Sequence, residues 1–364
     1  MSTLQWLQFL VSYVVQATLV IGLAWWLECR TVCVTTKSRI WSACYVSVIS
    51  LLATGLVLPR LEWVHPWSNL SSSLLLHVVS VQHVLGFSLL AVWFLGVCVM
   101  LVRWSIHFCI VRKFIRRCPA YPMETQRQLQ AMIPSECVGD DESPVQFRCS
   151  PPHYGPFCYQ FHRPLVFLPE LLLHGDLVAL EHVVRHEVTH LATQHPLQLF
   201  FQRMAETLLW FHPLVWACGH RAALVREFVC DDAASGDVES TASYLRTLLQ
   251  IVESRAVSPG GSLMFGHRHS DLRIRASRLA KADRQETYRA TWAHMVVLLM
   301  ALVASQLWLP TNPLSSRHTH YSPWPRWTAT IGHVFGVSLR DFEQFDAELQ
   351  IDELLEASRQ SASH

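Results

Sequence analysis

Five residues in the middle of the chain, His186-Glu-Val-Thr-His190, have the types and spacing needed to bind a catalytic metal ion. Two histidines four positions apart on a helix project from the same face, about one turn from each other. Both imidazoles can then bind one zinc ion, and Glu187 beside them can take a proton from a zinc-bound water. The pattern predicts hydrolysis of a peptide bond, with zinc as cofactor, His186 and His190 as metal ligands and Glu187 as general base.

A catalytic zinc ion takes three protein ligands and keeps one position open, so a third ligand must lie elsewhere. The downstream residues that offer a donor atom are His195, Glu206, His212 and Glu227. A metzincin site is excluded, because Thr193 and Pro196 stand where that class has a glycine and its third histidine. Glu227 and Asp231 are one helical turn apart, which suits a metal ligand and a carboxylate that holds an imidazole through its other N–H. Glu206 stays possible if the chain reverses tightly at Pro196.

The elements that position these residues include several membrane helices. The chain is 51% hydrophobic and only 16% charged, whereas a soluble domain is about a quarter charged. Four stretches without Lys, Arg, Asp or Glu are long enough to cross a bilayer, which takes about 20 helical residues. They are residues 7–27, 40–58, 84–102 and 290–309. We therefore expect four transmembrane helices.

Lysine and arginine gather on one side of these spans, after the first and third and before the fourth. Since such residues stay on the cytoplasmic side, the pattern places residues 103–289 in the cytoplasm. Residues 1–102 then form an N-terminal membrane region with three spans, and residues 310–364 form a short extracytoplasmic tail. The net charge of +1 gives no reason to expect direct nucleic-acid binding, and the 11 scattered cysteines favour reduced thiols over a disulfide framework.

The cytoplasmic block combines short strands with helices. Apolar runs at 145–149 and 165–168 predict two strands. A helix is expected from about Asp176 until before Pro196, and two further helices at 197–210 and 213–235. The fold class expected is a mainly α membrane protein with a cytoplasmic α+β domain.

The order of several motifs resembles that of the BlaR/MecR antirepressor membrane metallopeptidases. The matching features are three spans, Arg163-Pro-Leu-Val-Phe-Leu-Pro169, His186-Glu-Val-Thr-His190, Trp210-Phe-His-Pro-Leu-Val-Trp216, Glu227-Phe-Val-Cys-Asp231 and a fourth span. The resemblance implies a gluzincin-type metallopeptidase domain. It implies His186, His190 and Glu227 as zinc ligands, Glu187 as general base, and Asp231 as support for an imidazole. The edge of strand 165–168 would bind substrate as an added strand.

The resemblance also implies a function and a location. The protein would be a signal transducer in the bacterial cytoplasmic (inner) membrane that cleaves a cytosolic transcriptional repressor, itself, or both. The chain departs from the family in His195, where an acidic residue is usual, and a tail of about 55 residues is too short for the family's penicillin-binding sensor. A site-two-type intramembrane protease is disfavoured because His186–His190 lies outside the apolar stretches. The alternative from another class is a non-catalytic membrane receptor or scaffold that retains the zinc motif. Tyr244 is expected to pack between helices, with oxyanion stabilisation as its other possible role.

Overall fold

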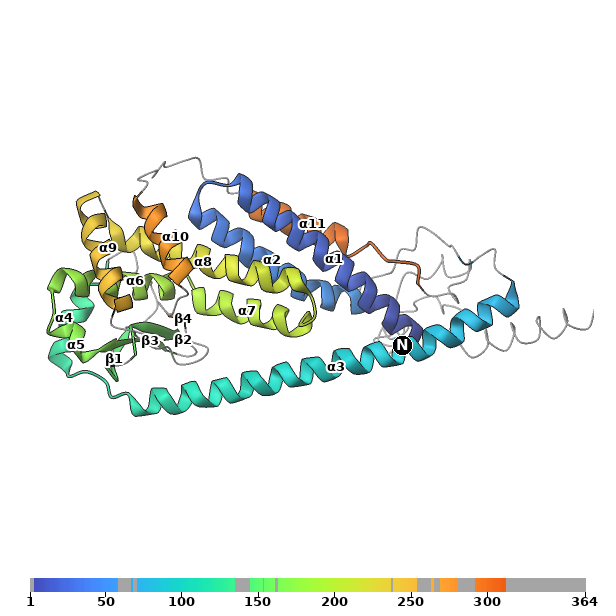
Figure 1. Cartoon of the computed structure of the whole chain (residues 1–364), viewed down its shortest axis with the longest axis horizontal. Helices are drawn as coiled ribbons and strands as arrows, with labels where there is room; N and C mark the ends of the chain where they lie inside the picture. The colour runs from blue at the N-terminus through green and yellow to red at the C-terminus, as the bar shows by residue number, and fades with distance from the viewer. Residues whose placement is uncertain are drawn as a thin grey trace, which may run out of the picture.

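The computed structural model describes residues 3–57, 67, 71–134, 145–152, 154–160, 163–236, 238–253, 263–264, 269–280 and 292–311. The helices are α1 (Thr3–Arg30), α2 (Val34–Val57), α3 (Ser72–Arg117), α4 (Met123–Ala131), α5 (Glu170–Leu173), α6 (Leu177–Ala192), α7 (His195–Leu208), α8 (Pro213–Ser235), α9 (Val238–Glu253), α10 (His269–Ala280) and α11 (Ala293–Ala304). The strands are β1 (Gln146–Ser150), β2 (Phe157–Gln160), β3 (Pro164–Pro169) and β4 (Leu263–Met264). The protein is mostly helical, as predicted (Figure 1).

Two helices among the described residues, α1 and α3, are long and apolar enough to cross a membrane by length and composition. They coincide with the predicted spans at 7–27 and 84–102. The predicted span at 40–58 falls on α2, and the one at 290–309 falls on α11, an apolar helix of 12 residues. Protein buries half of the apolar stretch of α1 but almost none of that of α3. The apolar stretch of α3 is therefore uncovered over most of its surface.

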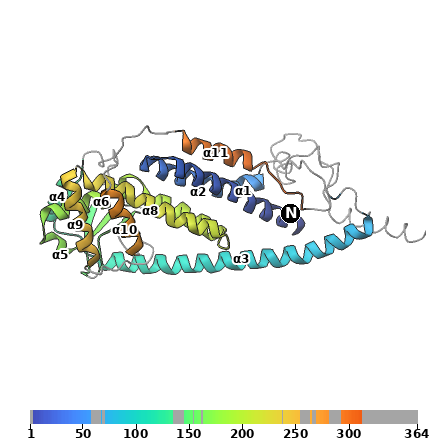
Figure 2. The ribbon, with the colours of Figure 1, turned by 45° about the horizontal axis from the view of Figure 1, so that its top comes forward.

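A first core joins α1, α2 and α11 to the α7–α8 hairpin. α1, α2 and α11 pack together, and α7 and α8 pack against α2. The hairpin lies between this bundle and α3 (Figures 1 and 2). Buried side chains in this core come from all of the packed helices; among them are Ile21, Trp41, Ala205, Val225 and Val297.

A buried ion pair ties the end of α1 to α8. Glu28 is only 3% exposed, and its carboxylate accepts a hydrogen bond from Arg221 of α8. Lys37, near the start of α2, is 3.6 Å from the same carboxylate. A buried carboxylate is stable only when it is paired, so these two cations fix three helices together at this point.

The second core belongs to the sheet and α6. The strand order is β1-β3-β2-β4, with β1 and β3 parallel and the other pairs antiparallel. The two predicted strands are confirmed as β1 and β3. The expectation that strand 165–168 offers a free edge is wrong, because β3 has β1 on one side and β2 on the other. Strand β2 (Phe157–Gln160) was not predicted from the sequence. Without β2, the position of β3 in the interior of the sheet could not be predicted.

Helix α6 lies against this sheet and carries the predicted zinc motif. Asp176 is its N-cap and accepts a hydrogen bond from the Val178 amide at 3.0 Å. Val183, Val184 and Val188 are buried with residues of β1 and β3 in one core, and each contributes about 1.5–3 kcal/mol to stability. The helix ends at Ala192, and Gln194 adopts a left-handed conformation with φ 55° before α7 begins. This one residue makes the tight reversal between the two helices.

Candidate active site

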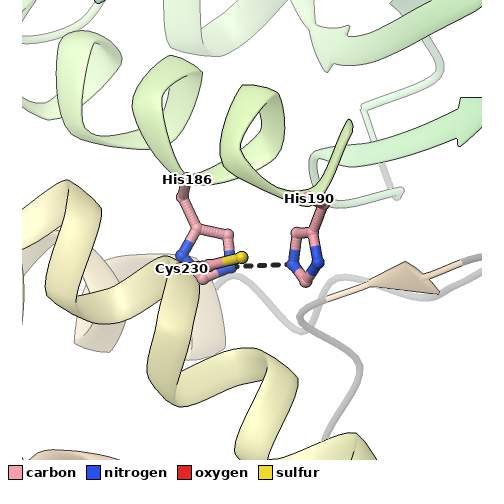
Figure 3. Close-up of side chains that lie close together, drawn as sticks. All are labelled: His186, His190 and Cys230. Atoms are coloured by element: carbon pink, nitrogen blue, oxygen red, sulfur yellow. Dashed lines mark hydrogen bonds between the residues drawn. The ribbon is translucent and has the colours of Figure 1, made fainter. Parts of the chain in front are cut away.

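The two imidazoles of α6 and a carboxylate of α8 meet at one point. The Nε2 atoms of His186 and His190 are 3.2 Å apart (Figure 3). Glu227 places one oxygen 3.5 Å from the Nε2 of His186 and the other 3.6 Å from the Nε2 of His190. Three ligands at about 2.0–2.1 Å from a tetrahedral zinc ion are about 3.3 Å from one another. The spacing of these three groups therefore fits a shared zinc ion.

The other candidates for the third ligand lie elsewhere. Glu206 accepts hydrogen bonds from Gln202 at 2.7 Å and Arg203 at 2.8 Å. His212 contacts Thr18 of α1 at 2.9 Å. His195 is close, but its Nδ1 faces the Nδ1 of His190 at 2.8 Å, on the side of that ring away from His186. Of the four candidates, Glu227 is the one that faces both Nε2 atoms.

Cys230 is a further potential ligand that the sequence reasoning missed. The thiol is fully buried, and its sulfur and the ligand nitrogens of His186 and His190 all lie within 4.8 Å of one another (Figure 3). Its sulfur is also 3.6 Å from the Nδ1 of His195. Burial and the charge of Glu227 raise the pKa of this thiol well above its usual value. The sequence feature that could have identified this potential ligand is its position three residues after Glu227, which puts both side chains on the same face of α8.

Glu187 has no hydrogen-bond partner of good geometry for either carboxylate oxygen among the described residues. The side chain is 1% exposed. Burial, followed by the negative charge of Glu227, raises its pKa well above the usual value, while Arg275 and the nearby Cys158 thiol of β2 act in the opposite direction. Buried polar atoms without a partner need an explanation. A water molecule on a metal ion at the adjacent Nε2 pair would supply one.

A chain of hydrogen bonds supports His186 from behind. The Tyr244 hydroxyl lies 2.9 Å from the Nδ1 of His186 and donates to Asp231 at 2.7 Å. Asp231 itself is 3.6 Å from that Nδ1, so Tyr244 stands between the imidazole and the carboxylate. This position puts the hydroxyl behind the ring, away from the Nε2 pair. Asp231 was expected to support an imidazole directly, but the Tyr244 hydroxyl, which was not predicted, lies between the two groups.

Arg275 of α10 holds both carboxylates of α8. It is fully buried, donates two hydrogen bonds to Asp231, one of them at 2.8 Å, and lies 3.0 Å from Glu227. In the sequence it is one of several arginines that precede the fourth predicted span. Its neighbours Arg273 and Arg278 have the same residue type and are not fully buried, so composition alone could not single it out.

The hydrogen bonds leave both Nε2 atoms ready to bind a metal. His186 donates from Nδ1 to Tyr244, so its Nε2 carries the lone pair. His190 can donate from Nδ1 to His195 in the same way. Burial lowers the pKa of His190 to about 3 and that of His195 well below its usual value, so both rings are neutral. A metal-binding histidine must be neutral.

The sequence matches a known family over residues 9–279, from within α1 to within α10. The description of that family is BlaR1 peptidase M56. The match covers well over half of the chain and every residue of the site described above. No curated protein matches the chain. The resemblance seen in the motifs is thus confirmed at the level of the family, whose peptidases require a metal ion. The chain belongs to the BlaR1 peptidase M56 family.

Proposed function

We propose that the protein is a membrane-bound zinc metalloendopeptidase with His186, His190 and Glu227 as ligands and Glu187 as general base. The observation that carries the proposal is the convergence of two neutral Nε2 atoms and one carboxylate beside Glu187, a buried carboxyl group with no hydrogen bond of good geometry among the described residues. A non-catalytic scaffold would have no use for Glu187, because a structural zinc ion needs only its ligands.

Residues of the chain have separate roles in the proposed hydrolysis. Bound zinc supplies a Lewis acid and brings the pKa of a water molecule close to neutrality. Glu187 takes a proton from the attacking water and passes it to the leaving amine; its raised pKa suits it to hold that proton. Tyr244 and Asp231 fix the ring of His186, and Arg275 supplies a buried positive charge beside Glu227 and Asp231.

We propose a protein substrate in the cytosol, such as a transcriptional repressor, and the chain itself as a second substrate. In this arrangement four transmembrane helices anchor the protein in the bacterial cytoplasmic membrane, and a gluzincin-type domain within residues 103–289 has its active site on the cytoplasmic side. One contact favours self-cleavage. β4 pairs with β2 at Phe157 and Cys158, and the Cys158 thiol is close to Glu187. A segment of the same chain thus already lies as an added strand near the site.

The test measures zinc content and cleavage separately. We expect one zinc per chain in the wild type, and loss of zinc in His190→Ala and Glu227→Ala. Glu206→Gln is the matched control, because Glu206 is a buried carboxylate of the same domain that does not face the imidazoles, and it should retain zinc. Zinc retained in Glu227→Ala would show that another residue is the third ligand.

Cleavage is followed in membranes, on the chain itself and on labelled casein. Glu187→Gln should keep zinc and lose at least about a thousandfold in rate, because it removes the group that moves the proton. A wild type without zinc, or a Glu187→Gln variant with full activity, would favour the scaffold.

A further inference from the structure

The hairpin formed by α7 and α8 reaches the apolar stretch of α3. The Trp93 indole donates to the Leu208 carbonyl at 2.9 Å, and the Trp210 indole donates to the Trp93 carbonyl at 3.3 Å. A Cβ atom added to Gly96 would lie 2.1 Å from the Trp210 ring, so the hairpin tip and α3 are in close contact. Trp93 and Gly96 lie within the predicted span at 84–102. The tip is therefore level with the apolar part of α3.

The same tip also reaches the middle of α1. The Nε2 of His212, in the turn between α7 and α8, lies 2.9 Å from the hydroxyl of Thr18. Thr18 is near the centre of the predicted span at 7–27. Two helices that are long and apolar enough to cross a membrane thus place the tip at the same depth, near the middle of each apolar stretch.

The amino-acid composition of the hairpin tip agrees with a position inside the bilayer. Residues 207–219 contain no Asp, Glu, Lys or Arg. An apolar stretch of about 10–14 residues is too short to span a bilayer and suits a re-entrant segment. The charged side chains of the hairpin lie nearer its base and are paired: Arg203 bonds Glu206 at 2.8 Å, and Arg221 bonds Glu28.

Several backbone polar groups of the turn find partners within the protein. Irregular backbone at membrane depth is stable only if its polar groups find partners within the protein. The Leu208 carbonyl accepts from the Trp93 indole, and the Leu209 carbonyl accepts from the His212 amide at 2.8 Å. The Trp210 carbonyl accepts from the Trp216 indole at 2.9 Å. Pro213, the first residue of α8, has no N–H to satisfy.

Part of the hairpin's apolar surface remains uncovered near its tip. Phe211 and Trp216 are 42% and 40% exposed, although both are large apolar side chains. The opposite face packs into the core with α1 and α2. An apolar face at this depth, next to the uncovered surface of α3, suits the acyl chains of lipids.

We propose that the α7–α8 hairpin is re-entrant: it enters the bilayer from the side of the catalytic core, turns near mid-depth and returns to the same side. Its uncovered apolar surface near the tip, defined by Phe211 and Trp216, contacts lipid acyl chains. α8 then runs without a break from the turn at mid-depth to Glu227 and Asp231. The inference concerns how the chain sits in the membrane and does not depend on catalysis.

Photolabelling from within the bilayer tests the depth of the hairpin. The full chain is reconstituted in phosphatidylcholine vesicles that contain a phosphatidylcholine with a diazirine at the middle of one acyl chain. After irradiation, labelled peptides are identified by mass spectrometry. We expect label on the peptide with Phe211 and Trp216 and on α3. Met123 of α4 and Leu171 of α5, which are 74% and 72% exposed, provide the internal control and should stay unlabelled. Label on α3 without label on the hairpin would overturn the proposal, including the case in which a second copy of the chain covers this face.

A pair of matched substitutions gives an independent test. Phe211→Asp should lower the amount of folded protein in the membrane roughly tenfold or more, because a carboxylate at this depth is costly. Leu171→Asp changes an exposed apolar residue outside the membrane and should leave the yield of folded protein unchanged. Phe211→Leu keeps an apolar side chain at the same position and should give the yield of the wild type. Equal yields for the two aspartate variants would overturn the proposal. Because the labelling experiment uses the unchanged chain, it decides the question even if Phe211→Asp fails to fold.

Discussion

The two imidazoles of α6 share one face of one helix, but the protein supports them differently. Behind His186 stand a hydroxyl, a carboxylate and a buried guanidinium, from Tyr244, Asp231 and Arg275. Behind His190 stands a neutral ring, that of His195. A carboxylate behind a metal-binding histidine raises its basicity as well as fixing its orientation, whereas a neutral acceptor does mainly the latter.

This difference teaches that the two sides of the site depend on different parts of the fold. The His186 side requires α8, α9 and α10 to meet in one buried network of charges. The His190 side requires only the reversal at Gln194 that brings α7 back beside α6. Changes on the His186 side should therefore have larger effects than changes on the His190 side.

Replacing Arg275 with Met should have the largest effect. The change leaves Asp231 and Glu227 buried without their cation, which costs about 3–5 kcal/mol of folding stability. Thermal unfolding followed by circular dichroism measures the loss. Arg278→Met is the matched control, since Arg278 pairs with Asp232 at a partly exposed site and should cost no more than about 1 kcal/mol. Equal losses would break the comparison, because they would show that the buried network carries no special weight.

Zinc affinity should fall more on the His186 side than on the His190 side. Tyr244→Phe removes the hydroxyl between His186 and Asp231 and should weaken zinc binding about 10–100-fold. His195→Gln keeps a neutral acceptor for the His190 Nδ1–H and should change affinity by only about threefold. Competition with a chromophoric chelator measures both. A larger loss in His195→Gln would reverse the comparison.

The metal-free protein should lose stability as the pH falls from about 6.5 towards 3. His190 has a pKa of about 3 in the folded protein and 6.5 as its ordinary value, so over this window the unfolded chain takes up a proton that the folded site refuses. The free energy of unfolding therefore decreases with acid. Urea unfolding after chelator treatment, at a series of pH values, measures the slope. His190→Gln should have a shallower slope, and an unchanged slope would contradict this assignment.

The smallest effect is expected for Cys230. If Glu227 is the third ligand, Cys230→Ser removes only a weak contact to His195 and should cost about 1 kcal/mol or less. The cobalt-substituted wild type should then lack the near-ultraviolet charge-transfer band of a thiolate–cobalt bond. The presence of that band, and its loss in Cys230→Ser, would place the thiol in the ligand set.

The sequence was informative where the pattern is local. The spacing of His186 and His190 and the start of a helix at about Asp176 are each set by neighbouring residues, and α6, α7 and α8 lie close to their predicted bounds. The pair Glu227 and Asp231 also lies on one turn of one helix, so its approach to the imidazoles could be predicted once α6 and α8 were expected to pack.

What could not be predicted depends on contacts between distant segments. Arg275 is buried only because α10 packs on α8, and nothing in its neighbourhood along the chain distinguishes it from exposed arginines. The placing of β3 inside the sheet depends on β2, which is too short for a clear pattern. The apolar tip of the hairpin is shorter than a span and has charged residues on both sides, so a search for spans passes over it.

Glu28 links α1 to α8, the helix that carries Glu227. Its partner Arg221 is six residues before Glu227, about 9 Å along α8, and no glycine or proline lies between them. A helix transmits rotation and translation over such a distance with little loss. A displacement of α1 that is passed on through this ion pair would therefore shift the Glu227 carboxylate relative to the two Nε2 atoms.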